Sequence, residues 1–541
     1  MVIRLKMFAL ACAAAIAAAC AGPSNAFRNN INAQIARGDF EGALKQVDNS
    51  KQKEYSKKNA VLYYLDRAAL LYDLERYNES DSSFAEADKL MDELFARSIS
   101  RGIGTVLLND NTTEYGGEIF ERAIMHTYRA MNFMMSGQKD EALVEARRVT
   151  SFLSRYSAFM KGKSGYRDSP FAQYLSAMLF EEAGQPDDAR IAYNAFKNAS
   201  AGDYSYLKTM RQPELSASSS KNNNSNSRRK SANRGRRRHQ NEINNSFDEL
   251  FSESESKSGS DLNSSFDELF SESEGSPNAE NKKTAVSAKA VSANRNAHAV
   301  SGPYSNGFDV PEYSKLGRDL GEIVLVHYNG PAPMKVSKTV QVAWNKAQAI
   351  VSSSGEHDER YENAIRAGFM GRAITVAYPE YVQRPYSITA SRLESENAQA
   401  DSILMEDITS AARTTLESKN SAIWARAVAR ATIKFVIANS IGQAGSRAIE
   451  KNIDGTAGQV LGLLFKAATH TAAAATEIAD TRGWVTLPAQ IRMARMTETP
   501  GIHNVKVLFL NGAGGVIGSK VFENVEVKAG QRTYLHCRTA L

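Results

Sequence analysis

Cysteine is scarce in this sequence of 541 residues, which contains only three. They are Cys12, Cys20 and Cys537. No CxxC pair occurs, so the usual zinc-ribbon and thioredoxin-like motifs are excluded. The eight histidines show no HExxH or related ligand spacing either. We therefore expect neither a metal nor another cofactor, and a fold that is stabilised by packing.

Recognisable catalytic motifs are missing as well. The sequence has no GxSxG nucleophile elbow. Its glycine-rich segment 512–518 has only a superficial likeness to a dinucleotide-binding loop, because Ile517 stands where the last glycine belongs and a predicted strand follows. A hairpin turn is the better interpretation of this segment.

Polar residues that could form a site have simpler structural explanations. His327, on a predicted strand, and His126, in a predicted helix, fit core histidines better than ligands. Four glutamates could pair as acid and base, but arginines on the same helices favour ion pairs. These residues are Glu118, Glu121, Glu141 and Glu145, with Arg122, Arg129, Arg147 and Arg148. The sequence thus predicts no enzyme.

The N-terminal apolar run is too short to cross a bilayer, which needs about 20 residues. It extends from Met7 to Ala19 after two basic residues, and it ends in small residues before Cys20. This arrangement is typical of a secretory signal. Ala17-Ala18-Ala19-Cys20 also resembles the lipobox of bacterial lipoproteins, which implies cleavage after residue 19 and acylation of Cys20. An ordinary secretory signal cut after an alanine is the alternative.

Lipidation of Cys20 would have several consequences. Its acyl chains would hold the protein on a membrane. Cys12 would leave with the signal and Cys537 would be the remaining thiol, so no intrachain disulfide could form. Ala21, rather than Asp, implies from the same resemblance a location on the outer membrane, facing the periplasm. The net charge of +6 falls by two without the signal, and it does not imply a nucleic-acid partner.

Residues 20–212 are predicted to be helical, and the clearest stretch is 115–148. Five apolar residues recur there at three- and four-residue steps and so share one helix face: Phe120, Ile124, Tyr128, Met131 and Met135. Ser136–Lys139 breaks the pattern, and Asp140 is expected to cap a second helix. The inner face of that helix is predicted to carry Ala142, Ala146, Val149 and Leu153.

Similar turns recur along this segment. The equivalent small residues Ala43, Ser80, Ala142 and Ala189 lie 37, 62 and 47 residues apart. Tetratricopeptide repeats recur about every 34 residues, so longer connections, such as 98–113, must intervene. We expect a tetratricopeptide-like array of helical hairpins that leaves a face for a partner's peptide or helix. A non-repetitive helical bundle is the alternative.

Residues 213–305 are rich in Ser, Asn and charge and have no hydrophobic period, which predicts a disordered insert. Two copies of SFDELF begin at Ser246 and Ser265. Each fits one helical turn that could dock on a partner; a duplicated solvated linker is the alternative. The apolar residues of the copies are Phe247, Leu250, Phe251, Phe266, Leu269 and Phe270. An upstream basic cluster, 228–238, suits anionic lipid headgroups or the acidic neighbours better than nucleic acid.

Residues 306–541 are predicted to form an α+β domain. Glu322–Tyr328 is expected as a buried strand that ends at Asn329-Gly330-Pro331. Ile374–Tyr378 is expected as a second strand, which Pro379 ends.

The rest of this domain is predicted to contain two long helices followed by three strands. Helices over Ala422–Ala448 and Ala457–Ile478 should form a close-packed hairpin, and their charges argue against membrane spans. Strands over Val505–Leu510, Gly518–Val527 and Arg532–Arg538 should form a terminal antiparallel meander.

Several short segments carry a family resemblance. They are Tyr115-Gly116 with Phe120-Glu121, Glu141–Arg148, Pro170-Phe171 with Tyr174–Ser176, Asn329-Gly330 with Pro333 and Lys335, Ala377–Pro379, and Asp480–Pro488. Together they resemble bacterial envelope lipoproteins with tetratricopeptide-like helices and a mixed C-terminal domain, encoded near an outer-membrane activator of penicillin-binding proteins. The resemblance covers about 26–212 and 321–497 and excludes the insert. It implies an anchored adaptor and supplies no catalytic residue.

Two functions follow as hypotheses. The first is a membrane-anchored, non-catalytic scaffold for envelope proteins, in cell-wall synthesis control or in secretion or appendage assembly. The second is a peptidoglycan-binding or wall-modifying protein with its site in the C-terminal domain. An acid pair in a deep cleft would favour the second, and an exposed apolar patch the first. Trp484 is either an internal anchor, which we favour, or an interaction hot spot.

Overall fold

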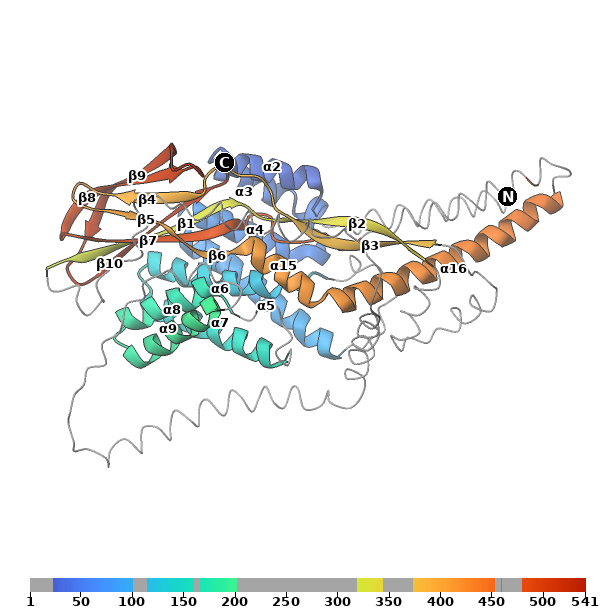
Figure 1. The fold of residues 1–541 in the computed structure, drawn as a ribbon, viewed down its shortest axis with the longest axis horizontal. Helices are drawn as coiled ribbons and strands as arrows, with labels where there is room; N and C mark the ends of the chain where they lie inside the picture. The colour runs from blue at the N-terminus through green and yellow to red at the C-terminus, as the bar shows by residue number, and fades with distance from the viewer. Residues whose placement is uncertain are drawn as a thin grey trace, which may run out of the picture.

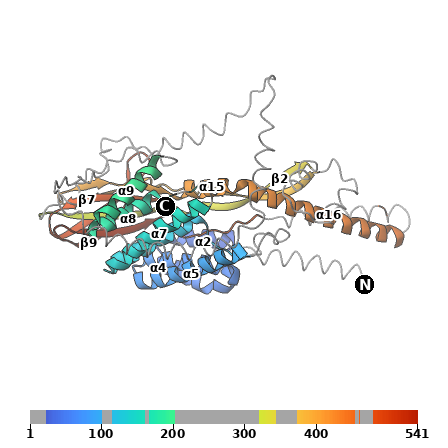
Figure 2. The ribbon, with the colours of Figure 1, turned by 90° about the horizontal axis from the view of Figure 1, so that it is seen from below.

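The computed structural model describes residues 23–100, 114–159, 166, 168–201, 319–343, 373–452, 459 and 479–541. An N-terminal helical array packs on one side of a strand-rich C-terminal domain (Figure 1, Figure 2). The predicted class, a helical array joined to an α+β domain, is confirmed. Cys20 and the insert with both SFDELF copies lie outside the described residues.

Four helical hairpins follow one another in the described part of the array. They are α2 (Asn25–Ala36) with α3 (Phe40–Asn49), α4 (Ala60–Asp73) with α5 (Tyr77–Ser100), α6 (Ile119–Met135) with α7 (Lys139–Phe159), and α8 (Pro170–Glu182) with α9 (Pro186–Ala201). The predicted inner faces of α6 and α7 are buried, with Met135 at their margin. Helix α7 begins at Lys139, so the prediction that Asp140 caps it is wrong; Asp140 lies in the first turn, where its charge suits the helix dipole.

Each of these hairpins turns through one residue with positive φ. The residues are Gly38, Glu75, Gly137 and Gly184. In each turn the following N–H donates to a carbonyl five residues earlier, at 2.7–2.9 Å, which is a helix C-cap of the Schellman type. The predicted equivalent positions Ala43, Ser80, Ala142 and Ala189 all lie five residues after this point and are fully buried. The common turn confirms repeated hairpins.

Glu75 is the non-glycine residue in this set, with φ +61°. The left-handed region costs an L-residue with a Cβ roughly 1 kcal/mol relative to glycine. We expect Glu75→Gly to raise the free energy of unfolding by about 0.5–1 kcal/mol in urea denaturation. Gly137→Ala is the matched control: a Cβ there meets nothing within 4 Å, so backbone strain alone should lower stability. An unchanged midpoint for Glu75→Gly would contradict this account.

A central mixed sheet covers the array with the strand order β10-β1-β7-β6. The strands are β1 (Gly321–Pro331), β6 (Ile403–Asp407), β7 (Pro488–Glu498) and β10 (Arg532–Thr539). On β1, Val324 and Val326 pack with the helices, whereas Ile323 and Leu325 belong to a second core on the other face. Two covered faces explain why β1 is buried throughout. It also continues through Pro331, so the expected stop at Asn329 is wrong: the ladder with β7 carries on to Pro331.

An outer sheet with the order β5-β4-β8-β9 covers this second core. Its strands are β4 (Ala390–Glu394), β5 (Gln399–Asp401), β8 (Gly501–Leu510) and β9 (Val516–Val527). The glycine-rich segment forms the predicted hairpin turn between β8 and β9. The three-strand meander is wrong, because β10 leaves this sheet and pairs in parallel with β1. Strand β10 is covered on both faces, because Tyr534 packs with the helices and Leu535 packs in the second core.

A two-stranded ribbon and a long helix extend from the body (Figure 1). They are β2 (Met334–Ala343), β3 (Ala373–Val382) and α16 (Asn420–Asn452), which follows α15 (Ile408–Ser418). Strand β3 runs past Pro379, against prediction. Among the described residues each ribbon strand pairs on one side only, and at an open edge a missing N–H is tolerated. Helix α16 confirms the first predicted long helix, whereas 457–478 lies outside the described residues apart from 459. No helix in the described ranges has the length and apolarity that crossing a membrane requires.

Candidate functional site

The surface between the helical array and the central sheet is lined with buried charges. The first helices α4, α6 and α8 pack against their own hairpin partners on one side and the C-terminal domain on the other. The face where a partner's peptide was expected is therefore covered by this chain's own sheet. Figure 2 shows the helices gathered along one side of the strands.

Glu322 on β1 lies at the centre of one charged cluster on this surface. Its two carboxylate oxygens accept from Arg495 of β7 and Arg532 of β10, at 2.5 and 2.8 Å. Arg532 also donates to Glu181 and to the Met178 carbonyl of α8. Burial alone would raise the pKa of Glu322, but the two guanidinium groups hold it below its ordinary value. The cluster joins three strands to one helix.

A second cluster lies at the start of α6. Lys335 of β2 and Lys419 donate to the two oxygens of Glu118 at 2.8 and 3.0 Å. Burial opposes the charge of Glu118, yet the two lysines lower its pKa. Glu121 accepts from the Tyr115 hydroxyl and from the Trp484 backbone N–H, and burial followed by the Glu118 charge raises its pKa.

Asp66 of α4 is fully buried against the loop that precedes β7. It accepts from the Tyr55 hydroxyl at 2.8 Å and from the backbone N–H and hydroxyl of Thr486 at 2.9 and 3.0 Å. These hydrogen bonds favour the charged form, but burial outweighs them and raises the pKa of Asp66 to about 6. The carboxyl group therefore costs stability once it ionises.

Asp66→Asn tests this cost through its pH dependence. The unfolded chain releases the proton near pH 3.8 and the folded chain near 6, so ionisation of Asp66 destabilises the fold as pH rises between these values. We expect the wild type to lose about 2 kcal/mol relative to Asp66→Asn between pH 4 and 7, measured by urea denaturation. Equal pH profiles for the two proteins would contradict the assignment.

The predicted structural roles of the histidines hold. His327 is buried between the hydroxyls of Ser391 and Thr539, at 3.0 and 2.7 Å, and burial lowers its pKa to about 3. His126 is buried and lies 2.7 Å from Glu145. Cys537 is a buried thiol whose pKa burial raises to about 12, so it is a poor nucleophile.

The predicted ion pairs of the glutamates hold in part. Glu145 pairs with Arg129 and Arg148, at 3.0 and 3.1 Å, as expected. Glu118 and Glu121 instead face the C-terminal domain, with the partners described above. Local spacing missed these partners because they lie more than two hundred residues along the chain.

Trp484 has the internal role that we favoured. It is buried, its rings lie 5.7 and 5.9 Å from Phe84 and Tyr128, and its Nε1–H donates to Thr486 at 2.8 Å. The neighbouring Arg482 pairs with Asp480 at 2.7 Å. Trp484 thus joins the helices to the sheet and presents no exposed face to a partner.

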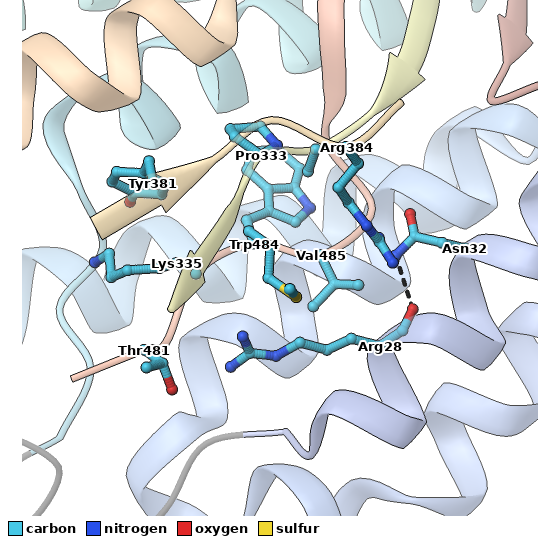
Figure 3. Close-up of a pocket in the computed structure, with 12 residues that line it drawn as sticks. Arg28, Asn32, Pro333, Lys335, Tyr381, Arg384, Thr481, Trp484 and Val485 are labelled. Atoms are coloured by element: carbon cyan, nitrogen blue, oxygen red, sulfur yellow. Dashed lines mark hydrogen bonds between the residues drawn. The ribbon is translucent and has the colours of Figure 1, made fainter. Parts of the chain in front are cut away.

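A pocket lies where α2 meets the C-terminal domain (Figure 3). Its lining includes Arg28 of α2, Lys335, Tyr381, Arg384 and Trp484. The free space inside is about 20 Å³, enough for about one water molecule. An organic substrate does not fit within it. Among the described residues, no group of three or more His, Cys, Asp and Glu side chains is placed to hold a metal ion.

An apolar patch is exposed on the outer sheet. Val516, Ile517 and Val521 of β9 are 57, 45 and 51 % exposed. Ser519, between them, pairs with the half-buried Leu508 of β8. Strand β9 is also an edge of its sheet, so it has no hydrogen-bonded strand on its outer side among the described residues. We name Leu508, Val516, Ile517 and Val521 the β9 patch. The sequence showed this strand but not which of its residues stay uncovered.

The geometry defines a mixed α and β protein in which a helical-hairpin array is packed on a two-sheet domain. No family model matches the chain, and no curated protein or solved structure matches it either.

Proposed function

We propose that this protein is a non-catalytic scaffold lipoprotein of the bacterial outer membrane, anchored through Cys20, facing the periplasm and binding other envelope proteins. Control of cell-wall synthesis, or assembly of a secretion system or appendage, is the setting. The observation that carries the proposal is the β9 patch, in which exposed apolar side chains coincide with an open strand edge. Such a strand can pair with an extended segment of another protein through its backbone.

The arrangement of the charged residues also supports a scaffold. Glu118, Glu322 and Asp66 are held by cations, hydroxyls or backbone N–H groups inside the molecule. A wall-modifying enzyme needs acids that face a substrate cleft. In the C-terminal domain, Glu322 is buried between Arg495 and Arg532 and does not face a cleft, which does not favour the alternative function, a peptidoglycan-binding or wall-modifying protein. The proposed binding surface is therefore the outer sheet instead of the helical array.

Site-specific photo-crosslinking in the native envelope tests the proposal. A photoreactive residue replaces Ser519, which is exposed on β9, in the lipidated protein. We expect a discrete protein adduct that Val521→Asp, on the same face of the strand, reduces at least fivefold. The same probe at Arg190, exposed on α9, is the control and should give no such adduct. Recovery of peptidoglycan fragments without protein from the Ser519 probe would overturn the scaffold proposal.

A further inference from the structure

We propose that the pocket beside α2 binds a phosphate group, and that this phosphate belongs to the headgroup of an anionic phospholipid. This end of the protein would then lie directly against the bilayer. The inference rests on the proposed lipid anchor at Cys20 for its geometry, but it concerns different residues. They are Arg28, Arg384 and the lysines of the segment that follows α3.

The observation that carries this inference is that Arg28 is buried without a partner among the described residues. Its residue is only 5 % exposed, and its guanidinium group makes no hydrogen bond or ion pair with any residue that the structure describes. Asp66 and Asp480 are the nearest acids that act on it, yet Asp480 pairs with Arg482 and Asp66 is held by Tyr55 and Thr486. Burial lowers the pKa of Arg28 more than these acids raise it. A buried cation without a partner is costly unless a ligand supplies the anion.

The pocket gives this cation access to a ligand. Figure 3 shows Arg28, Lys335 and Arg384 lining the space from different sides, together with Thr481 and Trp484. Arg384 donates to Asn29 at 2.6 Å, which holds it against α2, the helix that carries Arg28. Lys335 is already paired with Glu118, so the two arginines are the groups that remain for an anion. The space inside admits about one oxygen atom, and the rest of a ligand must stay at the mouth.

The short chain between Cys20 and Arg28 favours a lipid headgroup over free phosphate as the ligand. Helix α2 begins at Asn25, five residues after Cys20. Five residues of fully extended chain reach at most about 17 Å, and three further helical residues add about 5 Å. Arg28 therefore lies within about 22 Å of an acylated Cys20. Headgroup phosphates are the anions present at that distance from the acyl chains at high local concentration.

Further lysines lie at the same end of the molecule. The turns η1 (Lys51–Tyr55) and η2 (Lys57–Asn59) follow α3, and Lys53 and Lys57 are exposed on them. Glu54 of η1 accepts from the Ser24 backbone N–H at 2.8 Å, so these turns lie beside the start of α2. Basic residues near an anchor add to membrane attraction, by roughly fivefold in affinity for each charge.

Vesicle binding tests the inference without the anchor. The probe is the chain from residue 20 with Cys20→Ser, which keeps every described residue, added to vesicles of phosphatidylcholine with or without 30 % phosphatidylglycerol. We expect binding to the anionic vesicles only. Arg28→Gln and Arg384→Gln should each weaken it by about fivefold, and together by more than tenfold. The charge-matched control is Lys506→Gln with Lys528→Gln, which are exposed on β8 and just after β9, and it should leave binding unchanged.

The outcomes separate the possible explanations. Equal loss in the control and in the arginine variants would overturn a defined site and leave general charge attraction. Binding of inorganic phosphate at millimolar concentration, with no vesicle binding, would assign the pocket to free phosphate and overturn the lipid source. Arg384→Gln keeps the test valid if Arg28→Gln fails to fold, as judged by thermal melting. Mass spectrometry that finds Cys20 without lipid would end the proposed anchoring but not the measured vesicle binding.

Discussion

Glu322→Gln is expected to lower the free energy of unfolding by about 3–5 kcal/mol. The substitution keeps the shape of the side chain but removes the charge between Arg495 and Arg532, whose side chains are about 1 and 0 % exposed. Arg532 then keeps Glu181 as an acid partner, whereas Arg495 loses the charge of Glu322 and keeps its hydrogen bond to the Tyr174 hydroxyl. Breaking a buried ion pair by removing one partner is costly, because the remaining charge stays desolvated. Urea denaturation followed by circular dichroism measures the loss.

The control for this prediction is an ion pair on the outer sheet. Arg392 and Asp401 lie 2.7 Å apart and keep 19 and 28 % of their side-chain exposure. Water screens such a pair, so Arg392→Gln should cost less than about 1 kcal/mol. If Glu322→Gln were no more destabilising than Arg392→Gln, the Glu322 cluster would not stabilise the contact between the central sheet and α8.

Trp484→Ala is the second large effect, with an expected loss of about 3–5 kcal/mol. The indole is 2 % exposed and contacts Phe84 and Tyr128, which belong to two different helices of the array. Its removal leaves a cavity between rigid elements that cannot close easily. The backbone N–H of residue 484 still donates to Glu121, so the loss reports on the packing of the indole and on its hydrogen bond to Thr486. We expect a lower melting temperature and a lower urea midpoint.

Trp424 provides the comparison for this substitution. It lies on α16, is half-buried, and packs edge-on against Tyr378 with ring centroids 5.6 Å apart. Because part of its surface is already in water, Trp424→Ala should cost clearly less than Trp484→Ala. Equal costs for the two tryptophans would argue against Trp484 as an anchor between helices and sheet.

The sequence predicted those parts of the fold that are determined by short stretches of chain. The inner faces of α6 and α7, the buried strand β1 and the turn between β8 and β9 follow from spacing, composition and glycine. Cys20 and the SFDELF copies remain predictions, since they lie outside the described residues.

Long-range pairing could not be predicted in this way. Glu322 and Arg532 are 210 residues apart, and nothing near either residue indicates the other. The same holds for β10, whose sequence fits a meander as well as it fits a place beside β1. Arg28 illustrates the limit for the candidate site. An arginine near the start of a helix is unremarkable in sequence, and only its burial without a partner makes it informative.

The parallel pairing of β10 with β1 has a consequence for biogenesis. Strand β10 lies far along the chain from α4, α6 and α8, so the inner sides of these helices stay partly uncovered until 532–539 has been synthesised. The His536 ring then packs against Tyr72 with ring centroids 4.2 Å apart, and Arg532 donates to the Met178 carbonyl of α8. A chain halted before that point would expose apolar side chains of these helices to chaperones and proteases, which makes quality control sensitive to residues 532–539.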